Sequence, residues 1–214
     1  SWTRGGFTSQ FRQDKTVFNL LFRDRNTQGV YVDVASNHYK RISNTYFYDR
    51  CLGWQGVCVE PNPIYHDELQ RLRSCELFPT CASNSTDEVE LKLPVDTWIG
   101  ALGGINGGRM KEYVKQIEKS KRLSVAKRMR CVRVGDELRR LGVGHVDLFS
   151  LDVEGHERAV LDGIDFCSLH ISHIICEANC DSVLRGWGYA ASKPRGLVQT
   201  EVLWTRPQGS LPSC

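Results

Sequence analysis

The chain has 214 residues, of which 41% are hydrophobic and 25% are charged, and its formal net charge is +3. This composition is ordinary for one globular α/β domain with a substantial core, so residues 1–214 need no second domain. No apolar run approaches the roughly 20 residues of a membrane-spanning helix, which leaves no candidate membrane segment.

Hydrophobic periodicity predicts helices and strands that alternate along the chain. In chain order we expect a helix at residues 9–24 capped by Ser9, a strand at 30–34, a helix at 45–52, a strand at 56–59, a helix at 64–72, a short strand at 77–81, a half-exposed strand at 89–93, a helix at 134–141, a strand at 146–152, a helix from Glu157 to Leu161, a strand at 171–176, and two strands at 189–191 and 199–205 that form an edge hairpin. This order is typical of a mostly parallel sheet built from βαβ units.

A glycine-rich and basic insertion interrupts this pattern at about residues 100–130. Residues 100–108 contain five glycines, which predicts a mobile segment. Residues 109–133 carry ten Lys or Arg against Glu112 and Glu118, a net charge of +8 that leaves the rest of the chain near −5. Such a run is more often a solvated helix face than a site, although it could meet an anionic substrate or nucleic acid.

Three apolar runs end in carboxylates, as happens where buried parallel strands deliver polar groups to a ligand. The acids are Asp33, Glu60 and Asp152. The gap between Asp33 and Glu60 fits a helix and a return strand, which puts Glu60 where nucleotide-binding α/β folds keep an acceptor for ribose hydroxyls. The pattern therefore suggests a nucleoside cofactor.

The residues that carry this pattern resemble the FkbM family of S-adenosylmethionine-dependent methyltransferases over about residues 8–190. The matching motifs are Ser9-Gln10, Gln13-Asp14, Val32-Asp33-Val34, Ser43-Asn44-Thr45, Leu52-Gly53-Trp54, Glu60-Pro61-Asn62 and Leu151-Asp152-Val153-Glu154-Gly155-His156-Glu157. The resemblance implies an α/β, Rossmann-like class I methyltransferase fold, with a mostly parallel seven-stranded sheet, helices on both faces and an antiparallel edge hairpin. The chain has Ala35-Ser36-Asn37 where the family usually has Gly-Ala-Asn, so a β-carbon lies where the backbone approaches the cofactor most closely.

The resemblance also implies how the cofactor, S-adenosyl-L-methionine, would be held. Asp33 would lie by the methionine amino group, Glu60 would accept both ribose hydroxyls, and Asn37 would reach the carboxylate or nearby backbone. The full set of cofactor residues expected is Asp33, Ala35, Asn37, Asn44, Glu60, Pro61, Ala82, Ser83 and Asp152. Asp33 could instead be a helix-capping or strand-terminal acid, and Asn44 and Thr45 could cap the next helix.

The strand end at Asp152 supplies the catalytic candidates Asp152, Glu154 and His156. His156 is the natural general base because its ordinary pKa lies near neutrality, and Asp152 or Glu154 could orient it. Asp152 or Glu157 could alternatively cap the following helix. A magnesium site is the less favoured alternative, with Asp152, Glu177 and Asn179, or Asp181, as its hard oxygen ligands.

The leading interpretation is an O-methyltransferase that acts on a hydroxyl of a sugar, glycan or polyol-like molecule. A nicotinamide oxidoreductase is disfavoured, because no Gly-x-Gly-x-x-Gly follows the first strand. The alternative is a non-catalytic domain that binds polyanions or nucleic acid through residues 109–133, of which nucleic acid is the less expected ligand. An anionic acceptor would also suit that segment.

Nine cysteines leave the redox compartment open. Cys58 and Cys176 lie in predicted core strands, where a thiol packs as a small apolar group. The other cysteines lie nearer element ends, where pairing is easier, and no Cys-x-x-Cys spacing suggests zinc. The cysteine content favours the secretory-pathway lumen slightly over the cytoplasm, and the start at Ser1 suggests a processed or excised piece.

Overall fold

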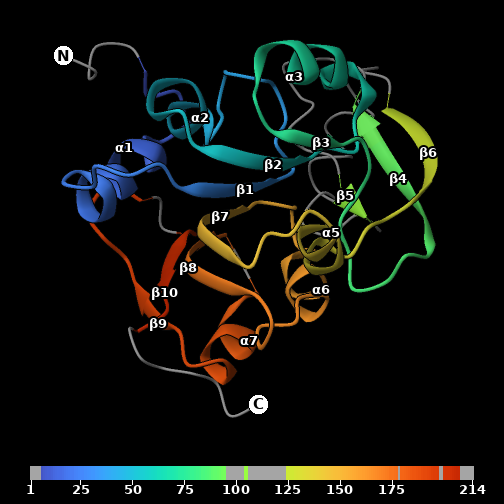
Figure 1. The fold of residues 1–214 in the computed structure, drawn as a ribbon. Helices are drawn as coiled ribbons and strands as arrows, with labels where there is room; N and C mark the ends of the chain where they lie inside the picture. Colours follow the sequence, from blue (N-terminus) through green and yellow to red (C-terminus); the bar gives the residue numbers. More distant parts are fainter. Residues whose placement is uncertain (1–5, 95–103, 106–123, 178, 198–199, 208–214) are drawn as a thin grey trace.

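A computed structural model describes residues 6–94, 104–105, 124–177, 179–197 and 200–207. Its centre is a seven-stranded sheet (Figure 1). In their order across the sheet, the strands are β3 (Glu76–Phe78), β2 (Gln55–Val59), β1 (Val30–Val34), β7 (His145–Leu151), β8 (His170–Cys176), β10 (Val202–Thr205) and β9 (Ala190–Ser192).

The first five of these strands run parallel, and β10 runs antiparallel between β8 and β9. The two C-terminal strands therefore form the antiparallel hairpin that was expected at the sheet edge. This arrangement confirms the prediction of an α/β, Rossmann-like fold. Because the parallel strands share one direction, Asp33 near the end of β1, Glu60 after β2 and Asp152 after β7 all lie at the same edge of the sheet.

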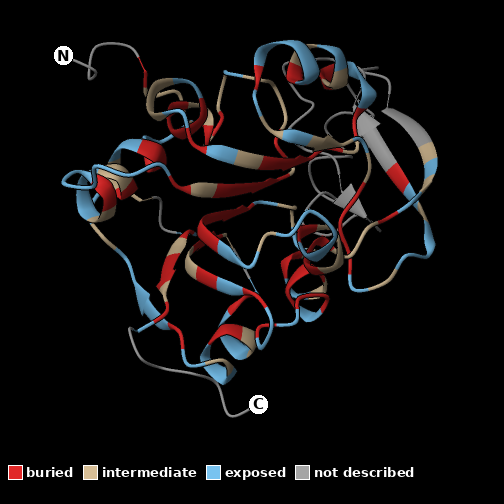
Figure 2. Ribbon diagram, in the orientation of Figure 1, coloured by how far each residue is buried: buried red, intermediate tan, exposed pale blue. Residues whose placement is uncertain are grey.

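Helices cover both faces of the sheet and bury a separate core on each (Figures 1 and 2). The helical elements are α1 (Gln13–Val17), the π-helix η1 (Phe18–Phe22), α2 (Tyr46–Leu52), the 3-10 helix η2 (Pro63–Tyr65), α3 (His66–Leu72), α5 (Val134–Arg140), α6 (Glu157–Asp162) and α7 (Asp181–Gly186). One core joins α1, η1 and α2 to Tyr31 and Leu148, whereas the other joins α5, α6 and α7 to Val32 and Phe149. Successive strand residues thus face opposite cores, as strand geometry requires.

The N-terminal helix begins later than the sequence predicted. It starts at Gln13 rather than at Ser9, and it continues as a π-helix from Phe18. Ser9 still bonds the first turn, because its hydroxyl accepts from the Asp14 N–H at 3.2 Å. The α7 helix was not predicted, because it has only six residues, which leave little periodicity to detect.

The basic insertion is a strand, not a helix, where the structure describes it. A second, antiparallel sheet has the order β5 (Gly104–Ile105), β4 (Glu88–Pro94) and β6 (Ser124–Arg130). Residues 124–130 pair along the whole length of β4, and this pairing overrides the helical character of a Lys- and Arg-rich run. Residues 95–103 and 106–123 lie outside the described part, so only Gly104 of the glycine-rich run is described, and it belongs to a strand.

Disulfides replace the buried thiols that the sequence suggested for Cys58 and Cys176. Among the described residues the structure contains the pairs Cys58–Cys75, Cys81–Cys131 and Cys176–Cys180, while Cys51 is a free thiol. Trp204 is buried in the core and Trp187 packs against Phe166, so both tryptophans have packing roles. In the described part of the chain, no helix has the length and apolar character that crossing a bilayer requires.

Candidate cofactor and catalytic site

Asp33, at the carboxyl end of β1, is held by a threonine rather than capping a helix. The residue is 4% exposed, and its carboxylate accepts a hydrogen bond from the Thr45 hydroxyl at 2.5 Å. Thr45 occupies the N-cap position of α2, but Ser43 provides the cap instead, because its hydroxyl oxygen accepts from the Tyr46 N–H. Burial raises the pKa of Asp33, and the nearby Arg73 charge opposes that rise.

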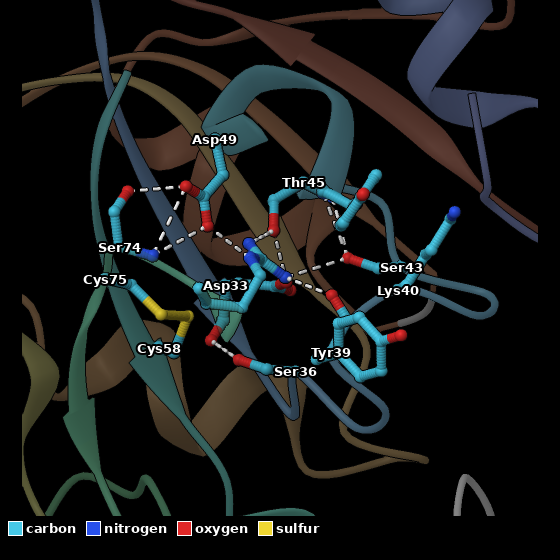
Figure 3. A network of polar contacts seen from close by, with 12 residues as sticks. Asp33, Ser36, Tyr39, Lys40, Ser43, Thr45, Asp49, Cys58, Ser74 and Cys75 are labelled. Atoms are coloured by element: carbon cyan, nitrogen blue, oxygen red, sulfur yellow. Dashed lines mark hydrogen bonds and ion pairs between the residues drawn. A yellow bond between two sulfur atoms is a disulfide. The ribbon is translucent and has the colours of Figure 1, made fainter. Parts of the chain in front are cut away.

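Arg73 organises this end of the sheet, and its side chain is fully buried together with that of Asp49. Figure 3 labels four residues of the network around it, which are Asp49, Tyr39, Ser43 and Thr45. Its five N–H donors are all used: they bond the Asp49 carboxylate, the Tyr39 carbonyl, and the hydroxyls of Ser43, Tyr31 and Thr45. A guanidinium can only donate, so the Thr45 oxygen must accept from Arg73 and turn its own proton toward Asp33. Asp49 balances the buried cation and also accepts from the Ser74 N–H.

Glu60 follows β2 and is 3% exposed. One carboxylate oxygen accepts from the Asn37 N–H and the other from the Asn62 N–H, each at 2.7 Å. Burial raises the pKa of Glu60 to about 7, although these two hydrogen bonds favour the ionised form. Each carboxylate oxygen can accept a second hydrogen bond, so the two oxygens of Glu60 could still accept from two hydroxyl groups.

The turn after β1 ties this strand to β2. The N–H groups of Ala35 and Ser36 both donate to the Val59 carbonyl, at 2.8 and 3.2 Å. Ala35 has φ 65° and Asn37 has φ 58°, a left-handed conformation that is strained for a residue with a β-carbon. The Asn37 side-chain oxygen accepts from the His38 N–H, so the backbone, rather than the side chain, of Asn37 contacts Glu60.

Asn44 provides a buried acceptor with unused capacity. Its side-chain amide donates to the Ser150 hydroxyl of β7 at 3.1 Å, but its buried oxygen has no hydrogen-bond partner among the described residues. A buried carbonyl oxygen without a donor is costly, so it favours a ligand that brings one. Together with the unused capacity of Glu60, these residues fit a cofactor rich in hydroxyl and amine donors.

His156 contacts Ser83 rather than the carboxylates that the sequence suggested as its orienting partners. Its Nε2 atom lies 3.0 Å from the Ser83 hydroxyl, in the turn that follows β3. The turn of Ala82 and Ser83 is itself fixed, because the Ser83 N–H donates to the Val132 carbonyl at 2.9 Å. Burial lowers the pKa of His156, which favours the neutral form of the ring.

Gly155 permits the tight turn between β7 and α6. It has φ 102°, which only glycine adopts without strain, and its N–H donates to a Glu157 carboxylate oxygen at 3.0 Å. Glu157 therefore bonds the turn before α6. His156 occupies the N-cap position of α6 without a side-chain cap hydrogen bond.

Carboxylates gather where β7 and β8 end. Oxygen atoms of Asp152, Glu157 and Glu177 all lie within 4.8 Å of one another. The pKa of Asp152 is raised well above its usual range. Loss of solvation contributes to this rise, and so do the neighbouring negative charges, of which those of Glu154 and Glu177 have the largest effect. Because the Asp152 side chain is exposed, we attribute more of this rise to the charges than to the lost solvation. Asp181 pairs with Arg185 instead of joining the group.

Sequence reasoning missed two residues of this site. Arg73 follows a short helix and looks like any surface base, so no local signal distinguishes it. Glu201 precedes β10, is 5% exposed and accepts from the Gln13 side chain at 2.7 Å. A charged residue directly before the apolar run Val202-Leu203-Trp204 was the available signal for Glu201.

Comparison with known proteins gives one family. The model of the methyltransferase FkbM domain matches residues 33–188, which is well over half of the chain and includes Asp33, Glu60, Asp152 and Glu177. Neither the curated proteins nor the solved structures yielded a match.

Proposed function

Because this chain belongs to the FkbM methyltransferase family, we propose that it is an S-adenosylmethionine-dependent O-methyltransferase whose acceptor is a hydroxyl of a sugar, glycan or polyol-like molecule. Transfer of a methyl group is the activity of the family. The methyl donor, the oxygen acceptor and the acceptor class are our proposals.

When bound, S-adenosylmethionine supplies an electrophilic methyl group on a sulfonium. The residues that would hold it are those at the carboxyl ends of β1 and β2 and in the neighbouring turns. We assign the ribose hydroxyls to Glu60, the methionine end to Asp33 and the turn of Ala35 and Asn37, and the adenine to the turn of Ala82 and Ser83.

The buried carboxylate of Glu60 is the observation that carries the proposal. Two backbone N–H groups fix both of its oxygens in position, and one acceptor site remains on each. A ribose presents two adjacent hydroxyls, which match two adjacent acceptors. Donation from those hydroxyls would also offset the desolvation that raises the pKa of Glu60 to about 7.

His156 is our candidate for the general base. Burial lowers the pKa of His156 and so favours the neutral imidazole, which has one nitrogen that can accept a proton from an acceptor hydroxyl. Ser83 fixes the orientation of the ring through the 3.0 Å contact with Nε2. Proton removal matters because a hydroxyl is a weak nucleophile until its proton leaves.

The disulfides support an oxidising compartment, and we propose the secretory-pathway lumen. Glycan hydroxyls are plentiful acceptors there. In the described part of the basic segment, Arg128 pairs with Glu90 and Arg133 pairs with Asp136, so part of its positive charge is already matched by carboxylates.

Calorimetric titration with S-adenosylhomocysteine tests the cofactor assignment. We expect the wild-type protein to bind this product and Glu60→Ala to bind at least about 100-fold more weakly, because two charge-assisted hydrogen bonds are lost. Glu76→Ala is the matched control, since Glu76 is exposed at the opposite end of β3, and its affinity should equal that of the wild type.

Two results would overturn the assignment. One is a folded wild-type protein that does not bind S-adenosylhomocysteine, and the other is equal affinity in the wild type and Glu60→Ala. Thermal unfolding of each variant checks that Glu60→Ala is folded, and Glu60→Gln, which keeps the shape of the side chain, provides a second measurement should Glu60→Ala not fold.

A further inference from the structure

The carboxylates at the ends of β7 and β8 form a compact oxygen-rich group that the cofactor assignment does not use in full. Asp152 follows β7, Glu157 opens α6 and Glu177 follows β8, so three separate elements deliver them. Oxygen atoms from all three lie within 4.8 Å of one another. Like charges at this separation repel, and the fold brings them together nonetheless.

Glu157 provides a second, independent observation. Its side chain is fully buried, at 0% exposure. One oxygen accepts from the Gly155 N–H, but the other has no hydrogen-bond partner among the described residues. A buried carboxylate oxygen without a donor carries a large desolvation cost, and a bound cation would remove it.

We propose that Asp152, Glu157 and Glu177 form a binding site for a hard divalent cation of the Mg²⁺ or Mn²⁺ type. Carboxylate oxygens are the ligands that these ions prefer, and the absence of sulfur and nitrogen donors from the trio disfavours zinc. Oxygens on one octahedral ion of this size lie about 3 to 4 Å apart, so small side-chain movements would close the trio around it.

The surroundings of the trio suit a cation in two further ways. Glu154 and Glu201 also act on Asp152 with their negative charges, so the local field attracts positive ions. Asp152 is exposed, which leaves a side open for the ion to enter and for other ligands to bind. This ligand set differs from the one that the sequence suggested, because Glu157 rather than Asn179 is the third member of the trio.

Three protein oxygens leave coordination positions for water and for one oxygen of the acceptor. This role rests on the proposed methyl transfer. A hydroxyl bound to the cation would be more acidic, because the positive charge would stabilise the alkoxide that remains after its proton passes to a general base. The cation would thereby select acceptors with a hydroxyl, and would favour those with a second oxygen beside it.

Titration with MnCl₂, followed by the electron paramagnetic resonance signal of free Mn²⁺, tests the site without any need for activity. After treatment with a chelator, the wild-type protein should bind close to one Mn²⁺ per chain. Glu157→Gln keeps the shape but removes one charge, and we expect it to bind at least about tenfold more weakly. Asp162→Asn is the control, because Asp162 is at the other end of α6 and pairs with Arg158.

Thermal unfolding gives an independent readout. Added Mn²⁺ should raise the melting temperature of the wild type and of Asp162→Asn, but not that of Glu157→Gln. Without metal, Glu157→Gln should melt no lower than the wild type, because it carries one buried charge fewer.

Absence of stoichiometric Mn²⁺ binding by the folded wild type, or equal binding by Glu157→Gln, would overturn the cation site. Titration of the same samples with S-adenosylhomocysteine separates the two proposals. Cation binding without cofactor binding would refute the proposed function and leave the site standing, whereas the reverse result would refute the site alone.

Discussion

Replacement of Arg73 by methionine should destabilise this protein more than any other single loss of a positive charge in the described part of the chain. The Arg73 and Asp49 side chains are both 0% exposed, and all five donors of Arg73 are used. In Arg73→Met the Asp49 carboxylate stays buried, and among the described residues it keeps Ser74 as its one side-chain hydrogen-bond partner. Breaking a buried pair from one side costs about 3 to 5 kcal/mol, a large part of the stability of a typical domain.

Urea unfolding followed by tryptophan fluorescence measures this cost. For a domain of this size, the loss corresponds to a fall of roughly 6 to 20 °C in melting temperature. Arg71→Met is the matched control: Arg71 is two residues away in α3, and its pair with Asp67 is 64% and 79% exposed. That variant should lose about 0.5 kcal/mol or less, because exposed pairs contribute little.

The double variant Arg73→Met with Asp49→Leu separates a buried charge from lost packing. It should be more stable than Arg73→Met alone, because it removes the carboxylate that the single variant leaves without its counter-ion. Equal losses of stability in Arg73→Met and Arg71→Met would contradict this role of the buried network. So would a double variant whose loss equals the sum of the losses in Arg73→Met and in Asp49→Leu.

Three further predictions concern the turn after β1, Glu60 and the disulfides. Ala35→Gly should raise stability by about 0.5 to 1 kcal/mol, because the left-handed conformation at φ 65° strains a residue with a β-carbon; a lower melting temperature would contradict this. The pKa of Glu60 is about 7 in the folded protein against an ordinary 4.5, so the folded state holds its proton longer. Protonated Glu60 therefore contributes to the stability of the folded state below pH 4.5, and this contribution is lost as the pH rises to about 7. The free energy of unfolding falls by about 3 kcal/mol at most over this range. The stability difference between wild type and Glu60→Gln, measured by urea unfolding from pH 4.5 to 8, should change in that window and stay flat above it. Joint replacement of Cys81 and Cys131 by alanine should cost about 4 kcal/mol, because this disulfide closes a loop with a sequence separation of 50, and an unchanged urea midpoint would mean that the two thiols are reduced in solution.

The sequence alone determined the sheet and the edge at which the chemistry lies. Runs such as Val30 to Val34 and Val146 to Leu151 are mainly apolar because both faces of a central parallel strand are buried, and that signal is local. The acids that end these runs needed no structure to be found, since the carboxyl ends of parallel strands meet at one edge. Family motifs spaced along the same runs supplied the activity.

Tertiary structure alone decided which residues are buried together. Arg73 looks like a surface base in the sequence, and only the approach of α2 and β1 encloses it. Residues 124–130 have the composition of a basic helix, but pairing with β4 makes them a strand, because hydrogen bonds to a distant partner outweigh local propensity. Glu157 differs from a helix-capping acid only through its burial beside Asp152 and Glu177, which β7, α6 and β8 produce together. Burial of this kind depends on contacts between residues far apart in the chain, and a linear pattern does not contain them.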